Sequence, residues 1–333
     1  MSRTRNEREI IRAIRAQLPE ESGRVLKGIG DDCAVLRQDG RRLQVLTVDT
    51  LIESVHFDRG WHPPELLGRK AAAVNLSDIA AMGAKPRFAL LSLGVPASLA
   101  AQWLDSFMAG FLEALAAEQT VLVGGDTVTT GGQLSLSVTV GGEVDEGEIL
   151  YRAGAQAGDL VWVSGPLGDA AAGLALCKEG KGADAPAWQQ LVKAHLDPEA
   201  ESALGPLLAA SGLLHAMMDL SDGIATDLAH LCAASGVGAE LVAEQLPLSE
   251  PLRAAAVRFR CPALDWVLKG GEDYRLLFTA PAGATLALER LVSEQLGRKI
   301  FCVGRIVQGS GVSLCDGSSR RDISYQGYDH FAP

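Results

Sequence analysis

The sequence lacks the patterns that mark several common classes of protein. No stretch approaches the roughly 18 uncharged apolar residues of a membrane span, and the charged segment Met1–Arg15 has no apolar core typical of a signal peptide. The six cysteines form no C-x-x-C pair, so neither a zinc site nor a disulfide framework is expected. Positive charge is scarce as well, since 30 Lys and Arg face 41 Asp and Glu. These absences favour a cytoplasmic protein with reduced thiols and no nucleic-acid or membrane partner.

Familiar catalytic motifs are missing too. The chain has no G-x-x-x-x-G-K-[ST] loop, no H-R-D loop and no H-E-x-x-H pattern among its six histidines. No Ser-His-Asp elbow is visible either. The chain is therefore neither a P-loop nor a protein-kinase-like enzyme, nor a zinc protease of the H-E-x-x-H type.

What the chain does have is enough apolar material for two cores. Its 333 residues are 47% hydrophobic and 21% charged. Apolar spacing and Gly/Pro stops predict helices over residues 7–18, 64–82 and 99–117, from 169, and from 223 to about 234. Strands are predicted over 33–36, 43–48, 121–123 (buried), 88–95, 134–140 and 160–163. Glycine and charge rise over 141–158, so we expect two α/β domains of α+β type, residues 1–148 and 149–333.

Aspartates stand out among the 37 glycines. Five short motifs carry them: Gly30-Asp31-Asp32, Thr47-Val48-Asp49-Thr50, Asn75-Leu76-Ser77-Asp78, Gly124-Gly125-Asp126-Thr127 and Asp219-Leu220-Ser221-Asp222-Gly223. Three of the motifs are expected to follow an apolar strand, at the sheet edge where open α/β folds bind ligands. The Asp78 motif instead lies on a mostly apolar helix, where an ionised carboxylate needs a partner.

Each aspartate alone has a simpler interpretation as a turn residue or a helix cap. Together they favour a metal site, because converging carboxylates repel one another unless cations intervene. Hard oxygen ligands with hydroxyl neighbours suit Mg²⁺, which bridges to substrate phosphates. The sequence thus predicts a magnesium-dependent phosphoryl transfer from ATP, a reaction that needs positioning and charge neutralisation rather than covalent help.

Two further segments have alternative interpretations. Gly165-Pro166-Leu167-Gly168-Asp169 joins a predicted strand to a predicted helix. Its amides either cradle a phosphate or form an ordinary turn capped by Asp169. Lys70, Lys85 and Arg87 flank the Asp78 helix and would steer anions, although surface placement is the default expectation for them.

The motifs occur in the order of a known family. Gly28-Ile29-Gly30-Asp31-Asp32-Cys33, Val74 to Ala84, Gly124-Gly125-Asp126-Thr127, Asp219-Leu220-Ser221-Asp222-Gly223, Gly270-Gly271-Glu272-Asp273-Tyr274 and the closing Gly327-Tyr328-Asp329-His330-Phe331 follow one another. From about residue 7 to the C-terminus the chain resembles the bacterial thiamine-monophosphate kinases, a family of the aminoimidazole-ribonucleotide-synthetase-like superfamily. The resemblance implies that two-domain fold, with mixed sheets covered by helices, and homodimers formed through the N-terminal domains, where Leu43–Val48 and Leu134–Val140 would pair across a two-fold axis.

The resemblance also implies roles for particular residues. Several magnesium ions would be held by Asp32, Thr47, the backbone carbonyl of Val48, Asp49, Asp78, Asp126, Asp219 and Asp222. ATP would contact Gly125, Asp126, Arg152 and Ser221, and thiamine monophosphate would contact His56, Glu272 and Tyr325. The family often carries Trp where Tyr325 stands, and a phenol ring can also stack on a thiamine ring.

The implied reaction is in-line transfer of the γ-phosphoryl group of ATP to the phosphate of thiamine monophosphate, which gives thiamine diphosphate. The acceptor oxygen is already ionised near neutral pH, so no general base is needed. Two alternatives remain at this point. One is another reaction of the same superfamily, on selenide, a formyl-glycinamidine ribonucleotide or a carbamoylated protein. The other is a non-catalytic nucleotide or metal sensor on the same fold.

Overall fold

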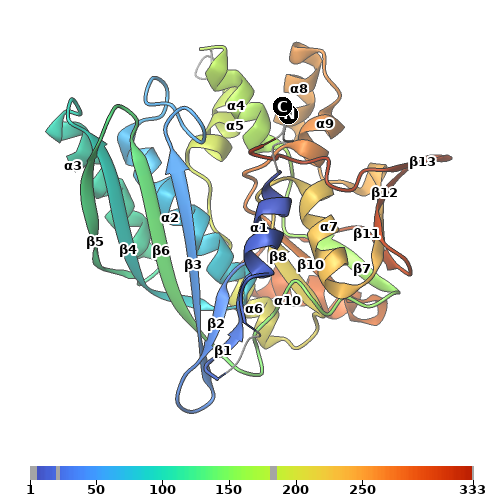
Figure 1. The fold of residues 1–333 in the computed structure, drawn as a ribbon. Coiled ribbons are helices and arrows are strands. Elements are labelled where there is room, and N and C mark those ends of the chain that lie inside the picture. Colours follow the sequence, from blue (N-terminus) through green and yellow to red (C-terminus); the bar gives the residue numbers. More distant parts are fainter. Residues whose placement is uncertain (1–5, 20–22, 181–185, 332–333) are drawn as a thin grey trace.

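The strands of the protein form two mixed sheets, each covered by helices (Figure 1). The computed structural model describes residues 6–19, 23–180 and 186–331. The first sheet has the order β1-β2-β3-β6-β4-β5 and the second the order β13-β12-β9-β11-β7-β10-β8. Each sheet contains one parallel pair, β4 with β5 and β12 with β9, among antiparallel neighbours. The expected α/β architecture of α+β type is confirmed.

The elements of the first half supply the first sheet and its covering helices. They are α1 (Glu7–Arg15), β1 (Val25–Lys27), β2 (Ala34–Arg37), β3 (Arg42–Ile52), α2 (Pro64–Ala81), β4 (Lys85–Pro96), α3 (Ala101–Ala117), β5 (Val121–Thr130) and β6 (Ser135–Asp145).

The second half supplies the second sheet. Its helices are α4 (Asp169–Lys178), α5 (Pro186–Leu196), α6 (Leu204–Ala210), α7 (Ile224–Ser235), α8 (Glu250–Phe259), α9 (Ala263–Lys269) and α10 (Thr285–Leu296), with two short 3₁₀ turns at Ala243–Gln245 and Ala282–Ala284. Its strands are β7 (Asp159–Val163), β8 (Ala216–Asp219), β9 (Gly238–Val242), β10 (Leu276–Pro281), β11 (Phe301–Val307), β12 (Gly311–Asp316) and β13 (Ser319–Asp322).

Helix α2 is the central element of the molecule. Pro64 occupies its first turn, where a missing N–H costs nothing, and Gly83 with φ +70° ends it as expected. Small residues let α3 approach closely, because a Cβ on Gly68 would lie 2.1 Å from the Phe107 carbonyl oxygen. Helix α2 packs on the first sheet and also contacts β8 of the second. Its buried residues therefore join the two halves.

Several strands run further than the sequence predicts. β3 continues to Ile52, so Asp49 lies inside this strand and not after its end. β5 continues from Val121 to Thr130 and contains Asp126. The expectation that Val121–Val123 is buried is wrong, since Val121 is 62% exposed and Val123 59%. β5 is the last strand of the sheet, and Leu122 between the two valines packs against the core, so Val121 and Val123 lie on the opposite, exposed face.

Helix α1 lies beside α7 of the second half (Figure 1), and its last residue, Arg15, reaches the Gly30 loop before β2. Asn6 and Glu9 form a capping box at its start, and the helix ends at Arg15, before the predicted Leu18. The Arg8 guanidinium lies 3.8 Å from the centroid of the Tyr325 ring. The N-terminal helix thus covers part of the C-terminal half.

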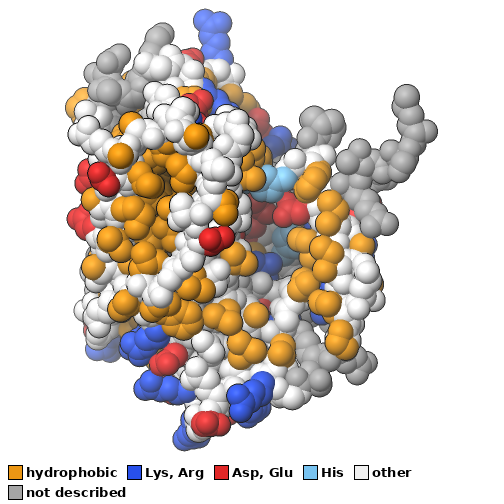
Figure 2. Space-filling model, turned by 60° about the vertical axis from the view of Figure 1, so that its left-hand side comes forward, with side chains coloured by type: hydrophobic (Ala, Val, Ile, Leu, Met, Phe, Trp, Pro, Cys, Tyr) orange, Lys and Arg blue, Asp and Glu red, His pale blue; other side chains and the backbone are white. Residues whose placement is uncertain are grey.

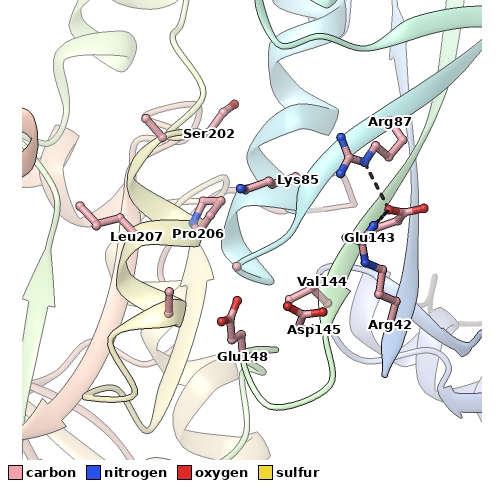
Figure 3. Close-up of a pocket in the computed structure, with 13 residues that line it drawn as sticks. Arg42, Lys85, Arg87, Glu143, Val144, Asp145, Glu148, Ser202, Pro206 and Leu207 are labelled. Carbon is pink, nitrogen blue, oxygen red and sulfur yellow. Dashed lines mark hydrogen bonds and ion pairs between the residues drawn. The ribbon is translucent and has the colours of Figure 1, made fainter. Parts of the chain in front are cut away.

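A cavity of about 440 Å³ lies where β4 and β6 meet α6 (Figure 3). Arg42 and Arg87 line it, and both bind Glu143. Lys85 and Arg87, two of the cations expected to flank the Asp78 helix, line it, but none of the predicted metal, ATP or thiamine monophosphate ligands does. In the part of the chain that the structure describes, no helix is long and apolar enough to cross a bilayer.

Candidate active site

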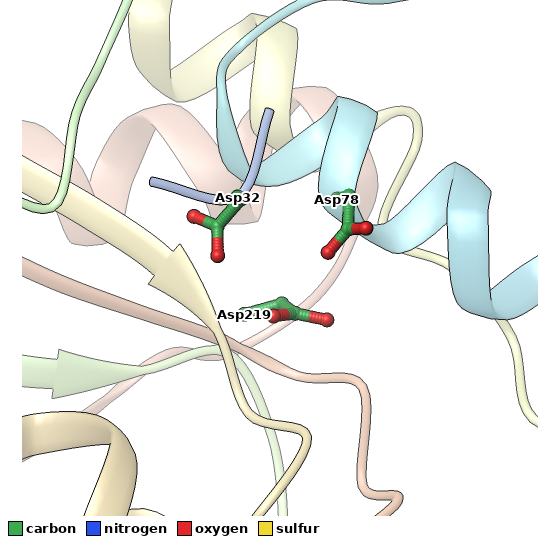
Figure 4. Close-up of side chains that lie close together, drawn as sticks. All are labelled: Asp32, Asp78 and Asp219. Atoms are coloured by element: carbon green, nitrogen blue, oxygen red, sulfur yellow. The ribbon is translucent and has the colours of Figure 1, made fainter. Parts of the chain in front are cut away.

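Three carboxylates from distant parts of the chain meet between the two halves (Figure 4). Asp32 lies in the loop before β2, Asp78 lies on α2, and Asp219 is the last residue of β8. One oxygen of each lies within 4.8 Å of the others. The predicted convergence is therefore real for these three aspartates.

Each of the three carboxylates has its own hydrogen-bond donor. Thr47 Oγ1 on β3 donates to Asp78 Oδ2 at 2.5 Å. Ser77 Oγ, one residue before Asp78 on α2, donates to Asp219 Oδ2 at 2.7 Å. Arg152 donates to Asp32 Oδ1 through Nε at 3.0 Å and through a second nitrogen. These donors fix the orientation of the carboxylates from elements of both halves.

Asp49 and Asp222 lie beside this cluster. The Asp49 backbone N–H donates to Asn75 Oδ1 on α2 at 3.0 Å, which ties β3 to that helix. The Asp222 N–H donates to Asp227 Oδ2 at 3.2 Å, from the buried first turn of α7. Charge on Asp49 raises the pKa of Asp78, so the two carboxylates act on each other electrostatically.

Burial and mutual repulsion raise the pKa values of the cluster. Burial, followed by the charge of Asp32, raises the pKa of Asp219 to about 7. Burial, then Asp49, Asp219 and Asp32, raise the pKa of Asp78 well above its ordinary value. Burial also raises the pKa of Asp32 despite Arg152. The protein therefore holds more negative charge here than its own cations compensate.

This donor set suits a hard divalent cation. All ligand atoms are carboxylate or hydroxyl oxygens, the kind that Mg²⁺ prefers. Asp32 Oδ2 is buried and has no hydrogen-bond partner in the protein. A buried carboxylate oxygen without a donor is costly, and a bound cation would remove that cost. Figure 2 shows acidic and histidine side chains in a hollow of the surface.

Glu272 forms a second charged group near the cluster. Its backbone N–H donates to the Ser221 carbonyl at 2.8 Å, so it adjoins the Asp219–Asp222 loop. Its carboxylate lies 2.7 Å from Lys70 Nζ and 2.9 Å from His195 Nδ1. Burial alone would raise the pKa of Glu272, but Lys70 and then His195 outweigh it and lower the pKa to about 2. Glu272 is thus an ionised side chain with two partners, not a simple turn acid.

His56 and Tyr325 each lie against another aromatic ring. His56 Nδ1 accepts from the Ile52 N–H at 3.0 Å, and its ring centroid lies 5.0 Å from that of His330. The Tyr325 ring contacts Arg8 on one face and the His230 ring edge-on, with centroids 5.2 Å apart. The C-terminal segment therefore brings the rings of Tyr325 and His330 against His230 and His56.

Asp126 does not join the cluster within one chain. It pairs with Ser92, which pairs with Ser137, which pairs with Thr50, so this row shares one face of the first sheet. Asp49 is next to Thr50 and points to the opposite face, toward α2. Asp126 is exposed and three strands away from β3.

Val48 and Gly125 have clear local roles. The Val48 side chain is exposed on the same face as Thr50, so only its backbone is available to a ligand on the α2 side. A Cβ on Gly125 would lie 1.8 Å from the Leu91 carbonyl oxygen. Close packing against β4 therefore requires glycine at 125 whatever else it contacts.

The loop before α4 is an ordinary strand-to-helix turn. Asp273 Oδ2 accepts from the Gly168 N–H at 2.7 Å, and the Leu167 N–H donates to the Pro247 carbonyl. A carboxylate of the chain itself thus occupies the helix start that a phosphate would need. Of the two interpretations of Gly165–Asp169, the structure favours the turn, but the predicted cap is wrong, since Asp169 accepts from Ser249 and Gly168 is the N-cap residue.

Sequence reasoning missed several residues that organise the site. Lys70 was expected at the surface, yet its side chain is completely buried. Asn75, Ser77 and Asp227 support the aspartates through hydrogen bonds. Helical spacing could have predicted the burial of Lys70, since Leu67 and Val74, one turn away on either side, are buried apolar residues.

Comparison with known proteins agrees with this geometry. Residues 30–144 match the family model "AIR synthase related protein, N-terminal domain", and residues 156–316 match the corresponding C-terminal domain. The two sheets and the carboxylates between them are thus those of an AIR synthase related protein.

The relatives narrow this class further. The thiamine-monophosphate kinase of Escherichia coli O157:H7 is 38% identical over 92% of both chains. A structure described as "AaThiL complexed with AMPPCP and TMP" superposes with a TM-score of 0.84 at 33% identity, over 98% of this chain and 97% of that one. The thiamine-monophosphate kinase of Stenotrophomonas maltophilia K279a is 40% identical, with a TM-score of 0.76 over 92% and 94% of the chains. This chain belongs to the thiamine-monophosphate kinase family.

Proposed function

We propose that this enzyme transfers the γ-phosphoryl group of ATP to thiamine monophosphate and releases thiamine diphosphate and ADP. The observation that carries the proposal is the meeting of Asp32, Asp78 and Asp219 from three distant segments. The family relatives share this length and fold, and one related structure is described as holding an ATP analogue together with TMP.

Magnesium ions would bind the carboxylates of the cluster, with Asp32, Asp78 and Asp219 as ligands and Thr47, Val48, Asp49 and Asp222 beside them. Bound there, they would neutralise the phosphate charge that otherwise keeps two polyanions apart. The buried, partnerless oxygen of Asp32 supports this assignment.

The protein's own residues position the two phosphates. In the transfer, an acceptor phosphate oxygen forms a bond to the γ-phosphorus while the bond to the bridging oxygen of ADP breaks. Arg152, held by Asp32 at the junction of the two halves, brings positive charge to the phosphates of ATP. Ser221 and Gly125 are the other proposed ATP contacts. His56, Glu272 and Tyr325 would hold the thiamine rings.

The direct test is a product assay. Purified protein with ATP, Mg²⁺ and thiamine monophosphate should form thiamine diphosphate, measured by chromatography, because the acceptor phosphate is a ready nucleophile. Thiamine, which lacks that phosphate, is the control acceptor and should give no product. Magnesium-dependent ATP binding without any product would contradict the proposed acceptor and favour another reaction of the superfamily.

We also propose that the protein is a homodimer formed through the exposed face of the first sheet. Figure 2 brings the β5 side of the molecule forward and shows hydrophobic side chains gathered on it. Val121, Val123 and Val128 of β5 are each more than half exposed, and Val48 of β3 is as well. The predicted pairing of Leu43–Val48 and Leu134–Val140 between subunits has little room, because β6 and Leu43–Leu46 already have strand partners on both sides within the chain. Among the described residues, β2 stops pairing with β3 at Leu46, so the outer edge of β3 is open from Thr47 on. We therefore propose face-to-face packing of the first sheets as the main contact between the subunits.

This packing would give Asp126 a role. Asp126 lies on the exposed face, at the edge strand, where a second copy would cover it. Because β2 stops pairing with β3 at Leu46, the edge of β3 beside Asp49 is open, and across an isologous interface each subunit would offer its Asp126 to the metal site of the other around that edge. The assignment of Asp126 to ATP and metal then requires the dimer.

Val123→Lys should convert the dimer to a monomer, because a charge on the buried face of an interface is strongly unfavourable. Light scattering measures the mass of each variant. Leu286→Lys is the matched control, since Leu286 is also an exposed apolar residue but lies on α10 of the other half. A Val123→Lys protein that stays dimeric would contradict the proposed interface.

We also propose the domain boundary and the cellular location of the protein. The domains run from 1 to 148 and from 149 to 333, and the gap between the two family matches, residues 145–155, contains this boundary. The cytoplasm is the proposed location, since all six cysteines are free thiols.

A further inference from the structure

Lys70 is the most unusual buried side chain of the molecule. It lies on α2 and is completely buried, a rare state for lysine unless it is paired. Its Nζ lies 2.7 Å from Glu272 Oε1 and donates to the His195 carbonyl at 3.1 Å. Two of its three donors are thus directed at named acceptors from the second half. Simple helix packing would be served better by an apolar residue at this position.

The full positive charge against Glu272 comes from Lys70. His195 Nδ1 also lies 2.9 Å from the carboxylate. However, burial and then the charge of Lys70 lower the pKa of His195, so its ring is neutral near pH 7. Removing Lys70 would leave Glu272 in a low-dielectric place without a compensating cation.

The backbone at Glu272 is in a strained conformation. Its φ is +69°, in the left-handed region that a residue with a Cβ rarely adopts. Gly271 before it lies against the Ser221 carbonyl, where a Cβ would come within 2.4 Å. The side chain remains 22% exposed although two partners bind it. Strain that persists beside a ligand site is typical of a residue placed for function.

We propose that Lys70 is a positioning residue that keeps Glu272 a hydrogen-bond acceptor only, and so makes the enzyme select an acceptor with a ring amino group over one with a ring oxo group. This inference rests on the proposed function.

The chemistry of the carboxylate explains the selection. An ionised carboxylate offers about four acceptor sites and no donor, and Lys70 and His195 leave some of them free. The pyrimidine ring of thiamine carries an exocyclic amino group, which donates to such an oxygen. A 4-oxo ring presents a carbonyl oxygen, which the carboxylate repels. A protonated Glu272 would accommodate both rings, because it can donate as well as accept.

The test compares thiamine monophosphate with its 4-oxo analogue, oxythiamine monophosphate. The wild type should prefer the amino acceptor by at least about 100-fold in kcat/KM, since a site built to hydrogen-bond a substrate group can reject an analogue without it by about 10⁴-fold. Lys70→Met should lower this preference to less than about fivefold, mainly through KM for the amino acceptor, while KM for ATP stays unchanged. Lys70→Arg should retain most of the preference, because it keeps the charge. Lys193→Met, an exposed lysine on α5, is the matched control.

A second comparison holds if Lys70→Met does not fold. Lys70→Met/Glu272→Gln buries no unpaired charge, and it is compared with Glu272→Gln alone. If Lys70 acts through Glu272, the two proteins should show the same reduced preference. A further fall in the double variant, or a folded Lys70→Met protein with wild-type preference, would overturn the role of Lys70. A wild type that phosphorylates neither acceptor would instead overturn the proposed function.

Discussion

Asp219→Asn is expected to lower kcat/KM about 1000-fold, the scale of losing one preorganised electrostatic group at a site of charge transfer. Asp219 is buried at the end of β8, accepts from Ser77, and shares the cluster with Asp32 and Asp78. The amide keeps the shape and loses the charge. Steady-state turnover with ATP and thiamine monophosphate measures the effect. Asp316→Asn, at an exposed strand end, is the control and should be fully active.

The same variant should change how stability depends on pH. The pKa of Asp219 is raised from 3.8 to about 7 in the folded protein, so the folded state holds its proton longer than the unfolded state. Stability of the metal-free wild type should therefore fall as pH rises from about 4 to about 7. Asp219→Asn should flatten that fall, and Mg²⁺ should stabilise the wild type above pH 7 but the variant much less. Thermal unfolding at a series of pH values measures both. Equal pH slopes in the two proteins would contradict the raised pKa of Asp219, which comes first from its burial and then from the charge of Asp32.

Two inactive variants are expected to restore activity when they are mixed. Asp126→Asn and Asp219→Asn should each be inactive alone, because each removes a carboxylate from every site of a symmetric dimer. If Asp126 serves the partner's site, a mixed dimer has one site that retains both carboxylates. After equal subunits are mixed and exchanged at random, about half of the dimers are mixed and activity should reach about a quarter of the wild type.

The controls of this experiment separate the possible arrangements. Mixing Asp78→Asn with Asp219→Asn should restore nothing, since both carboxylates belong to one chain's cluster. Adding Val123→Lys to both partners should abolish the recovery if dimers are required. No recovery in the Asp126→Asn and Asp219→Asn mixture, with subunit exchange shown independently, would contradict a shared site.

Local patterns predicted the helices and the central aspartates well. The Pro64 start and the Gly83 stop gave α2 almost to the residue, and Asp219 ends its strand as expected. These features depend on the chain immediately around them, through caps, turns and short periodicities. The family resemblance added the order of motifs along the chain, and the comparisons confirmed it.

Features that depend on distant pairing were not predictable in this way. A short apolar run such as Val121–Val123 has the same letters in a central strand and in an edge strand, so its exposure was not predictable. The face on which Asp126 lies follows from its register with Ser92 on β4, which no local pattern reveals. Lys70 looked like a surface lysine because its partner, Glu272, lies far along the chain.

Helix α2 sets the distance between the proposed thiamine-binding residues and the metal cluster. Lys70, near the start of α2, holds the carboxylate proposed to bind the thiamine ring, and Asp78, near its end, belongs to the metal cluster. At about 1.5 Å of rise per residue the two lie about 12 Å apart along a continuous helix. Helix α2 therefore fixes the distance between the carboxylate proposed to bind the thiamine ring and the metal cluster. An acceptor whose linker between ring and phosphate is too short or too long would reach one of the two, but not both.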